Sequence, residues 1–219
     1  MSRPQDYVVL LHGLARTRRS FWRMERVLNR SGFRVVNVNY PSTRYPIEVL
    51  ADDAISAALS QCQGAQRVHF VTHSMGGILL RQYLSQKPIE NLGRVVMLGP
   101  PNQGSEIVDV LGGVPGFKLI NGPAGLQLGT SEHSVPNRLG DADFELGVIA
   151  GSRTVNLLLS RLLPKPNDGK VSLQSTRLKG MKAHLVLPVT HSFMMQNRKV
   201  IEQSIHFLQK GAFLSAGSP

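Results

Sequence analysis

The sequence has a single cysteine, Cys62, among its 219 residues, so no disulfide can form within the chain. Cys62 falls where a helical pattern expects an apolar side chain, and we interpret it as core packing. No stretch approaches the roughly 20 apolar residues that a transmembrane helix needs. The apolar run Tyr7–Leu11 is short and ends at a His-Gly turn, unlike a signal peptide. We therefore expect a soluble, cytoplasmic protein.

Acidic residues are few: 14 Asp and Glu stand against 25 Lys and Arg, for a net charge of +11. Part of the excess forms a stripe at helical spacing, made of Arg19, Arg23, Arg26 and Arg30. Such a stripe is typical of the solvated face of a surface helix. The alternative is attraction to an acidic substrate or weak contact with an anionic membrane surface. No aromatic residues interleave with these arginines, and we predict no binding to nucleic acid.

The chain also lacks internal repeats and low-complexity tracts, and its length fits one domain spanning residues 1–219. Apolar runs alternate with segments of helical period, which predicts an α/β fold with a mostly parallel central sheet flanked by helices. The expected strands are Tyr7–Leu11, Phe33–Val38, Arg67–Val71, Arg94–Leu98, Glu145–Ala150 and Ala183–Pro188. The expected helices are Ser20–Arg30, a segment from Ile47 to Cys62, Gly77–Gln86 and Ser192–Lys210.

Residues 99–140 break this alternation, because they are rich in glycine and proline. Only Ser105–Leu111 and Phe117–Ile120 have short helical patterns there. We interpret the segment as a small cap inserted over a substrate site, and a plain long connection is the alternative. By position alone, Gly112–Phe117, Leu126 and Leu128 are candidates to line an acyl pocket.

A candidate nucleophile lies between the strand Arg67–Val71 and the helix that begins at Gly77. The residues Thr72-His73-Ser74-Met75-Gly76 have the form of the G-x-S-x-G elbow, with Thr72 in place of the first glycine. The elbow needs small residues on both sides of the serine because neighbouring backbones approach closely. We predict that Ser74 is a nucleophile; the alternative is a serine that only caps the helix.

A serine nucleophile needs a histidine base and a carboxylate that orients the base. His191 follows the last expected strand and precedes the final helix, where a loop histidine can reach the serine. Asp168 lies between Ser74 and His191 in chain order, in the turn Asn167-Asp168-Gly169. The rival bases, which lie in strands, a helix, the insertion or beside the serine, are His69, His73, His133, His184 and His206. The rival acids Asp141 and Asp143 precede a strand, which would place them at the wrong end of the sheet. The remaining alternative is that Asp168 only stabilises its turn.

The oxyanion of such a reaction needs two backbone N–H donors that point to one place. We expect one from Met75, directly after the nucleophile, and the other from Leu14 in the turn His12-Gly13-Leu14. For His12 itself we expect a structural hydrogen-bonding role.

These motifs together resemble the bacterial lipase/esterase branch of the α/β-hydrolase superfamily. The resemblance rests on His12-Gly13-Leu14, His73-Ser74-Met75-Gly76-Gly77, Gly99–Ser105, Asn167-Asp168-Gly169 and His191-Ser192-Phe193-Met194. It implies a site at the carboxyl ends of the strands, the triad order Ser, Asp, His, and neither metal nor organic cofactor. Small bacterial lipases of this type often have alanine at the position of Thr72. Because the insertion is small, an esterase for short or medium acyl chains is as compatible as a true lipase.

The resemblance implies a serine hydrolase that cleaves a small-molecule or lipid ester through Ser74, Asp168 and His191. An acyltransferase, a thioesterase or an amidase would use the same triad, so the sequence barely separates them from an esterase. A non-catalytic module that binds a membrane surface through the arginine stripe is the alternative from another class. Fold alone does not decide among these functions.

Overall fold

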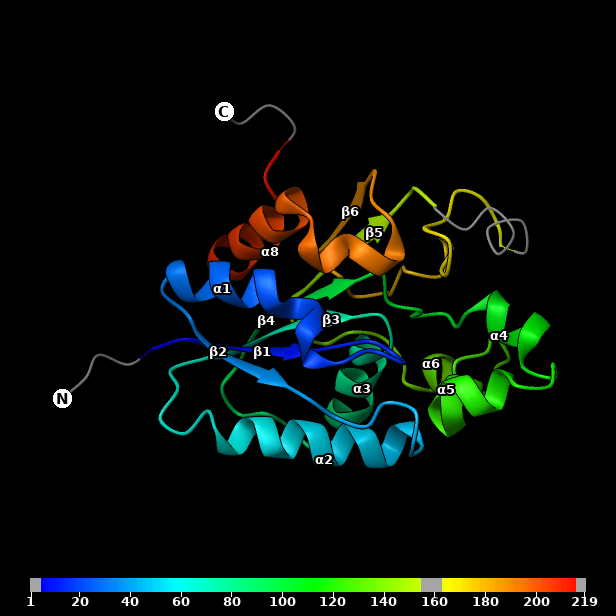
Figure 1. Cartoon of the computed structure of the whole chain (residues 1–219). Coiled ribbons are helices and arrows are strands. Elements are labelled where there is room, and N and C mark those ends of the chain that lie inside the picture. The colour runs from blue at the N-terminus through cyan, green and yellow to red at the C-terminus, as the bar shows by residue number, and fades with distance from the viewer. Residues whose placement is uncertain (1–4, 155–162, 216–219) are drawn as a thin grey trace.

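The computed structural model describes residues 5–154 and 163–215, and it contains a six-stranded sheet between layers of helices (Figure 1). The strand order is β2-β1-β3-β4-β5-β6, and every neighbouring pair is parallel. The strands are β1 (Tyr7–Leu11), β2 (Arg34–Val38), β3 (Val68–His73), β4 (Leu92–Leu98), β5 (Leu146–Gly151) and β6 (Ala183–Leu187). The predicted α/β fold with a parallel sheet is confirmed, and each expected strand is present within two residues of its predicted bounds.

Helices cover both faces of the sheet. On one face lie α1 (Trp22–Arg30), which follows a 3₁₀-helix at Arg18–Phe21, and α8 (Arg198–Lys210) (Figure 1). On the other face lie α2 (Ile47–Ser60) and α3 (Met75–Leu84). Within the described residues, no helix is long and apolar enough to cross a membrane.

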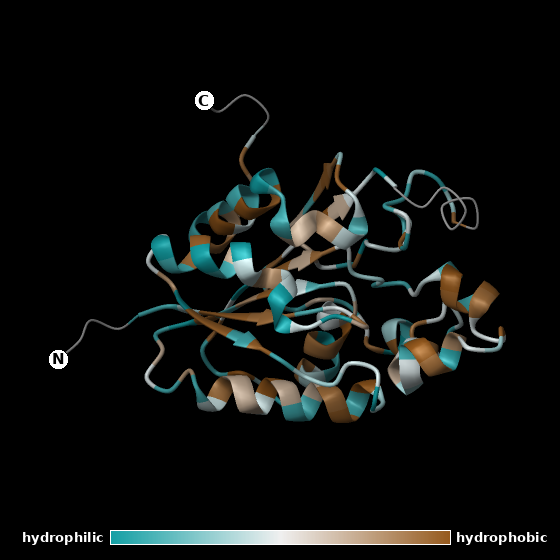
Figure 2. Cartoon of the chain, viewed as in Figure 1, coloured by the Kyte–Doolittle hydropathy of each residue, from teal (hydrophilic) through white to brown (hydrophobic). Residues whose placement is uncertain are grey.

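The central strands are apolar on both sides because helices cover both. In β1, Val8 and Leu10 belong to the core under α1 and α8, whereas Val9 and Leu11 belong to the core over α2 and α3. This division follows from the two-residue period of a strand. In Figure 2 the strands are correspondingly brown, and the outer faces of α1 and α8 carry much of the teal. The predicted core residue Cys62 is buried on the α2 side.

The last helix is shorter than the sequence pattern indicates. We expected one helix over Ser192–Lys210, but a 3₁₀-helix occupies His191–Gln196 and α8 begins only at Arg198. The interruption is an N-cap: the Asn197 side chain accepts hydrogen bonds from the Lys199 and Val200 amides at 2.9 and 3.3 Å. The loop that carries His191 is thereby separated from the regular helix.

The segment 99–140 contains α4 (Glu106–Leu111), α5 (Phe117–Leu126) and α6 (Val135–Arg138), beyond the carboxyl ends of the strands (Figure 1). Helix α5 ends six residues beyond the predicted Phe117–Ile120. Its chain bends at Gly122, whose φ is 66°, and a second helical stretch continues from Pro123. Several large apolar residues of this segment are exposed, up to 89% for Leu119.

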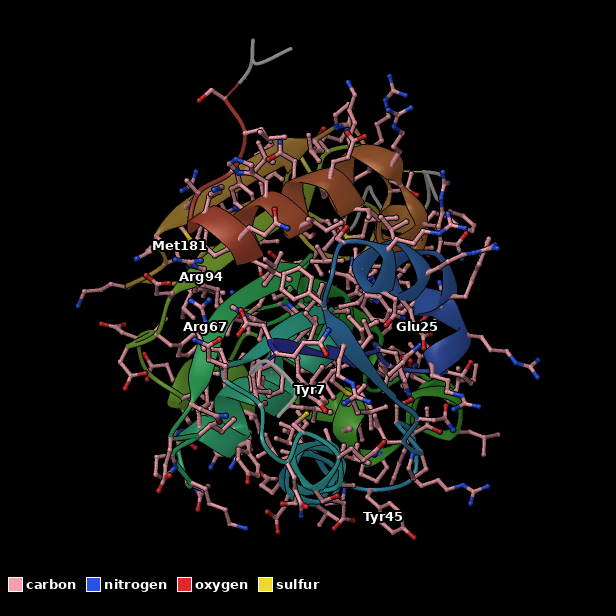
Figure 3. The ribbon with its side chains drawn as sticks, turned by 90° about the vertical axis from the view of Figure 1, so that its left-hand side faces the viewer. Tyr7, Glu25, Tyr45, Arg67, Arg94 and Met181 are labelled. Atoms are coloured by element: carbon pink, nitrogen blue, oxygen red, sulfur yellow. The ribbon has the colours of Figure 1, made fainter. Side chains whose placement is uncertain are left out.

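The opposite, amino edge of the sheet is polar and fastened by ion pairs. Figure 3 looks at this edge, with Tyr7, Arg67 and Arg94 labelled. Arg94 of β4 bonds to Glu145 at 2.7 Å and to the carbonyl of Leu208 at 2.9 Å. These contacts tie the end of α8 to the sheet at the edge far from segment 99–140.

Phe207 provides a test of how α8 stabilises the sheet. Its ring is fully buried and covers Gly147 so closely that a Cβ there would lie 2.7 Å from the ring. Phe207→Ala should lower the free energy of unfolding by about 3–5 kcal/mol, since it empties a packed site. The control is Phe193→Ala, because Phe193 is 58% exposed. Equal losses for both variants in urea unfolding would contradict this view of the core.

Candidate active site

Ser74 stands on a sharp turn between β3 and α3. Its φ is 52° and its ψ is −124°, a backbone conformation that side-chain-bearing residues rarely adopt. The turn is held by hydrogen bonds from the Ser74 amide to Leu98 at 2.9 Å and from the Gly77 amide to Ser74 at 3.0 Å. The strand, turn and helix therefore lie where the elbow motif predicts them.

Close backbone packing explains the small residues around this turn. A Cβ on Gly76 would collide with the carbonyl oxygen of Leu11 at the end of β1, and a Cβ on Gly77 would lie 3.2 Å from the Thr72 hydroxyl. Thr72 is fully buried, and its hydroxyl has no hydrogen-bond partner in the part of the chain that the structure describes. Threonine thus fits in place of the usual glycine, but it leaves one polar atom unsatisfied.

The structure brings Asp168 and His191 into contact. The Nδ1 atom of His191 lies 2.7 Å from Oδ2 of Asp168, and the two residues are only 4% and 3% exposed. The other carboxylate oxygen accepts hydrogen bonds from the amides of Lys170 at 3.0 Å and Val171 at 2.8 Å. Since a carboxylate only accepts, the proton of the imidazole sits on Nδ1. The Nε2 atom then keeps its lone pair, as a general base requires.

His73, beside the nucleophile, has a role that sequence reasoning missed. Its Nε2 atom donates to the backbone carbonyl of His191 at 3.0 Å, and the two rings lie 4.8 Å apart. Desolvation, and then the neighbouring His191, lower the pKa of His73 well below its ordinary value, so it stays neutral. Its Nδ1 faces Gly13, where a Cβ would lie 2.8 Å away. His73 therefore helps to hold the loop of His191, a link between distant segments that local motifs do not reveal.

His12 has the structural role that the sequence predicts. Its ring stacks on the ring of Tyr40, with 4.0 Å between the ring centroids. Nδ1 of His12 lies 2.9 Å from the carbonyl oxygen of Gly13, and the Tyr40 amide donates to Nε2 at 3.4 Å. The Tyr40 hydroxyl also donates to the His12 carbonyl. These contacts fix the turn after β1 next to Ser74.

The two amides expected to bind an oxyanion are free to do so. Leu14 contributes to the cavity wall together with Ser74, and Met75 is the first residue of α3, where a helix leaves its N–H groups unpaired. Among the described residues, neither the Leu14 nor the Met75 N–H donates a hydrogen bond to another group. Their role as oxyanion donors stays a prediction.

A cavity of about 280 Å³ opens beside Ser74 and His191. Loops after β1, β3, β4 and β5 and the loop of His191 all contribute to it, so it lies at the carboxyl edge of the sheet. Most of its apolar wall comes from segment 99–140, namely Ile107, Val108, Leu111, Phe117 and Leu128. Of the residues expected by position, Phe117 and Leu128 line this cavity, whereas Gly112–Gly116 and Leu126 do not.

The rival residues lie elsewhere. Asp141 pairs with Lys179 at 2.9 Å ahead of β5, and His184 lies 2.8 Å from the hydroxyl of Thr176. None of the rivals except His73 lines the cavity formed by the described residues: His69, His133, His184, His206, Asp141 and Asp143 are all outside it. The four arginines of the stripe are exposed and also lie outside the cavity.

In the described part of the chain, no cluster of three or more His, Cys, Asp or Glu residues could hold a metal ion.

Comparisons with known proteins place these features in a family. A sequence model described as the alpha/beta hydrolase family matches residues 8–167. No curated protein sequence matches the chain.

Solved structures resemble the fold at low sequence identity. The Bacillus licheniformis lipase BlEst2 in its propeptide form is 17% identical with a TM-score of 0.72, and the match covers 99% of this chain and 53% of that one. Phospholipase PlaB from Legionella pneumophila is 17% identical with a TM-score of 0.71, over 95% and 60% of the two chains. A monoacylglycerol lipase of Paleococcus ferrophilus is 15% identical with a TM-score of 0.61, over 94% and 95%. The chain thus spans little more than half the length of the first two.

Four desolvated histidines predict that acid destabilises the fold. Desolvation lowers the pKa of His12, His69, His73 and His184, in the last case to about 4. The unfolded chain binds a proton at each of them as the pH falls through the ordinary pKa of 6.5, whereas the folded chain binds it only at lower pH. The free energy of unfolding should therefore fall from pH 7.5 to 5.5, by up to about 1 kcal/mol for each histidine.

Urea unfolding at several pH values measures this dependence. His184→Gln should flatten it, and His206→Gln is the control, because His206 is not one of these four histidines. A wild-type stability that stays constant between pH 7.5 and 5.5 would refute the assignment.

Gly76 tests the tight contact at the elbow. Gly76→Ala should destabilise the protein by about 1–3 kcal/mol, because the added methyl group forces the start of α3 away from β1. Gly113→Ala is the matched control, since a Cβ there meets nothing within 4 Å. Thermal unfolding compares the two variants, and similar melting temperatures would argue against the contact.

Proposed function

The chain belongs to the alpha/beta hydrolase family, and from this premise we propose that it is a serine hydrolase that cleaves carboxylic esters. The catalytic residues would be Ser74, Asp168 and His191. The observation that carries the proposal is the 2.7 Å hydrogen bond from His191 Nδ1 to the buried Asp168, together with a cavity that both Ser74 and His191 line. The bond orients the imidazole so that its other nitrogen, Nε2, can act as the base for the strained serine of the same cavity.

The first half of the reaction forms an acyl-enzyme. Ser74 Oγ attacks the ester carbonyl while Nε2 of His191 takes its proton, and a tetrahedral oxyanion results. Asp168 stabilises the imidazolium and keeps the ring in its productive orientation. The carbonyl then reforms, the bond to the alcohol oxygen breaks, and His191 gives its proton to the departing alcohol. The acyl group stays on Ser74.

The second half repeats these steps with water. His191 removes a proton from water, the hydroxide attacks the acyl-Ser74 carbonyl, and the acid leaves as Ser74 recovers its proton. In both halves the amides of Leu14 and Met75 would stabilise the oxyanion. Both are free of other hydrogen bonds within the described chain, which supports this role.

The cavity favours an ester with a modest acyl group. Its volume of about 280 Å³ and its wall of Ile107, Val108, Leu111, Phe117 and Leu128 suit an apolar chain of limited length. Segment 99–140 would act as a small cap over this chain. Lipases and a phospholipase among the structural neighbours agree with an ester or lipid ester as substrate. The exposed apolar residues of α4 and α5, brown in Figure 2, are compatible with contact at a lipid surface.

Replacing the nucleophile tests the proposal. Ser74→Ala should lower kcat/KM for p-nitrophenyl esters by about a thousandfold or more, since the acyl-enzyme no longer forms. Ser56→Ala is the matched control, because Ser56 is an exposed serine of α2. Release of p-nitrophenol from a series of acyl chain lengths provides the measurement and ranks the acyl groups.

The outcomes separate the competing functions. Ester turnover that Ser74→Ala leaves intact would refute the proposed nucleophile. Turnover that yields a new ester when alcohols are added would instead favour an acyltransferase on the same triad. An absence of turnover on every ester, together with no labelling of Ser74 by a fluorophosphonate, would refute catalysis through this serine.

A further inference from the structure

Two cationic side chains line the cavity that contains Ser74. Arg16 comes from the loop after β1, and Lys170 comes from the turn of Asp168. The remaining wall is largely apolar, so two positive groups are conspicuous beside the nucleophile. Within the described residues, neither side chain forms an ion pair with an aspartate or a glutamate.

The positive charges of Arg16 and Lys170 repel each other. Desolvation, followed by the positive charge of Arg16, lowers the pKa of Lys170, and Asp168 raises it in part. Asp168 forms no hydrogen bond with the ammonium group in the described structure; its carboxylate oxygens accept from the amides of Lys170 and Val171 and from His191. The cavity therefore holds a positive field that no carboxylate of the described chain neutralises by direct contact. An anion entering it would relieve the repulsion between Arg16 and Lys170.

The triad indicates on which side of the ester that anion would lie. His191 delivers a proton to the departing alcohol, so the alcohol portion of the substrate lies on the histidine side of Ser74. Lys170 follows Asp168 by two residues and belongs to the same turn that holds the imidazole. The apolar wall, in contrast, comes mostly from Ile107–Leu128 and suits the acyl chain.

We propose that Arg16 and Lys170 bind an anionic group, a phosphate or a carboxylate, in the alcohol portion of the ester substrate. The inference rests on the proposed ester hydrolysis and adds to it the class of substrate. The guanidinium group of Arg16 provides paired donors for a planar or tetrahedral anion, and the ammonium group of Lys170 provides a flexible point charge. Neighbouring groups desolvate the ammonium group of Lys170 in part, but the residue as a whole is exposed, so a ligand can reach it from solvent.

A matched pair of chromogenic esters tests this preference. 4-Nitro-3-(octanoyloxy)benzoate and 2-nitrophenyl octanoate share the acyl chain and the nitrophenol, and only the first carries a carboxylate on the alcohol side. The wild-type kcat/KM should be higher for the charged ester by about tenfold, and the ratio should fall as salt screens the attraction.

Variants assign the preference to the two cations. In Arg16→Gln combined with Lys170→Gln the ratio of the two kcat/KM values should fall to near one, whereas Lys170→Arg should keep most of it. Lys199→Gln combined with Lys210→Gln is the matched control, because it also removes two charges, from the exposed surface of α8. A ratio of one in the wild type, or a high ratio that the double variant keeps, would overturn the inference.

The source of the anion is tested with lipid substrates of one acyl chain. Preference for a lysophosphatidate over the corresponding monoacylglycerol supports a phosphate in a lipid headgroup. Competitive inhibition by inorganic phosphate, weakened in the double variant, supports recognition of the phosphate itself. If only the two chromogenic esters show the preference, the natural alcohol portion carries a carboxylate. Serine-dependent turnover without any charge preference would overturn only this inference, whereas an absence of serine-dependent turnover would overturn the proposed function.

Discussion

The contact between the start of α3 and the end of β1 sets the geometry of the whole site. Gly76 lies so near the Leu11 carbonyl that no side chain fits between them, and a Cβ on Gly13 would lie 2.8 Å from the ring of His73 and 3.1 Å from Cβ of Ser74. Because the two turns are in contact, Ser74 and Leu14 line one cavity. The strained φ of Ser74 persists since the packing of β1, β3 and α3 leaves the turn no alternative path.

A second group of contacts joins segments far apart in the chain. His73 supports the backbone of His191, His191 bonds to Asp168, and the Asp168 turn carries Lys170 to the same cavity. The turn after β3, the turn after β5 and the loop after β6 thus form one connected unit. A change in any of the three segments would be felt by the other two, since their contacts are buried hydrogen bonds.

Much of the fold could be predicted from the sequence, because buried parallel strands and amphipathic helices leave strong periodic signals. The elbow at Ser74 was recognisable because its motif is local, and the pairing of Asp168 with His191 followed from chain order and turn chemistry. The helix break at Asn197 and the bend of α5 at Gly122 were missed, since the apolar pattern continues across both. The contact of His73 with His191 spans 118 positions, so no local pattern could reveal it. The Arg16 and Lys170 pair was missed for the same reason: each residue alone resembles an ordinary surface cation.

The described chain begins at the amino edge of the sheet and ends alongside α8. Gln5 bonds to Gly32 and to the amide of Gln66, and Leu214 bonds to Gln203 on α8. Ser74 and its cavity lie at the carboxyl edge of the sheet. Fusion partners, purification tags or immobilisation linkers joined at residue 5 or 215 would consequently be attached at a distance from the cavity entrance. The architecture separates the points where the chain can be extended from the place where a substrate would enter.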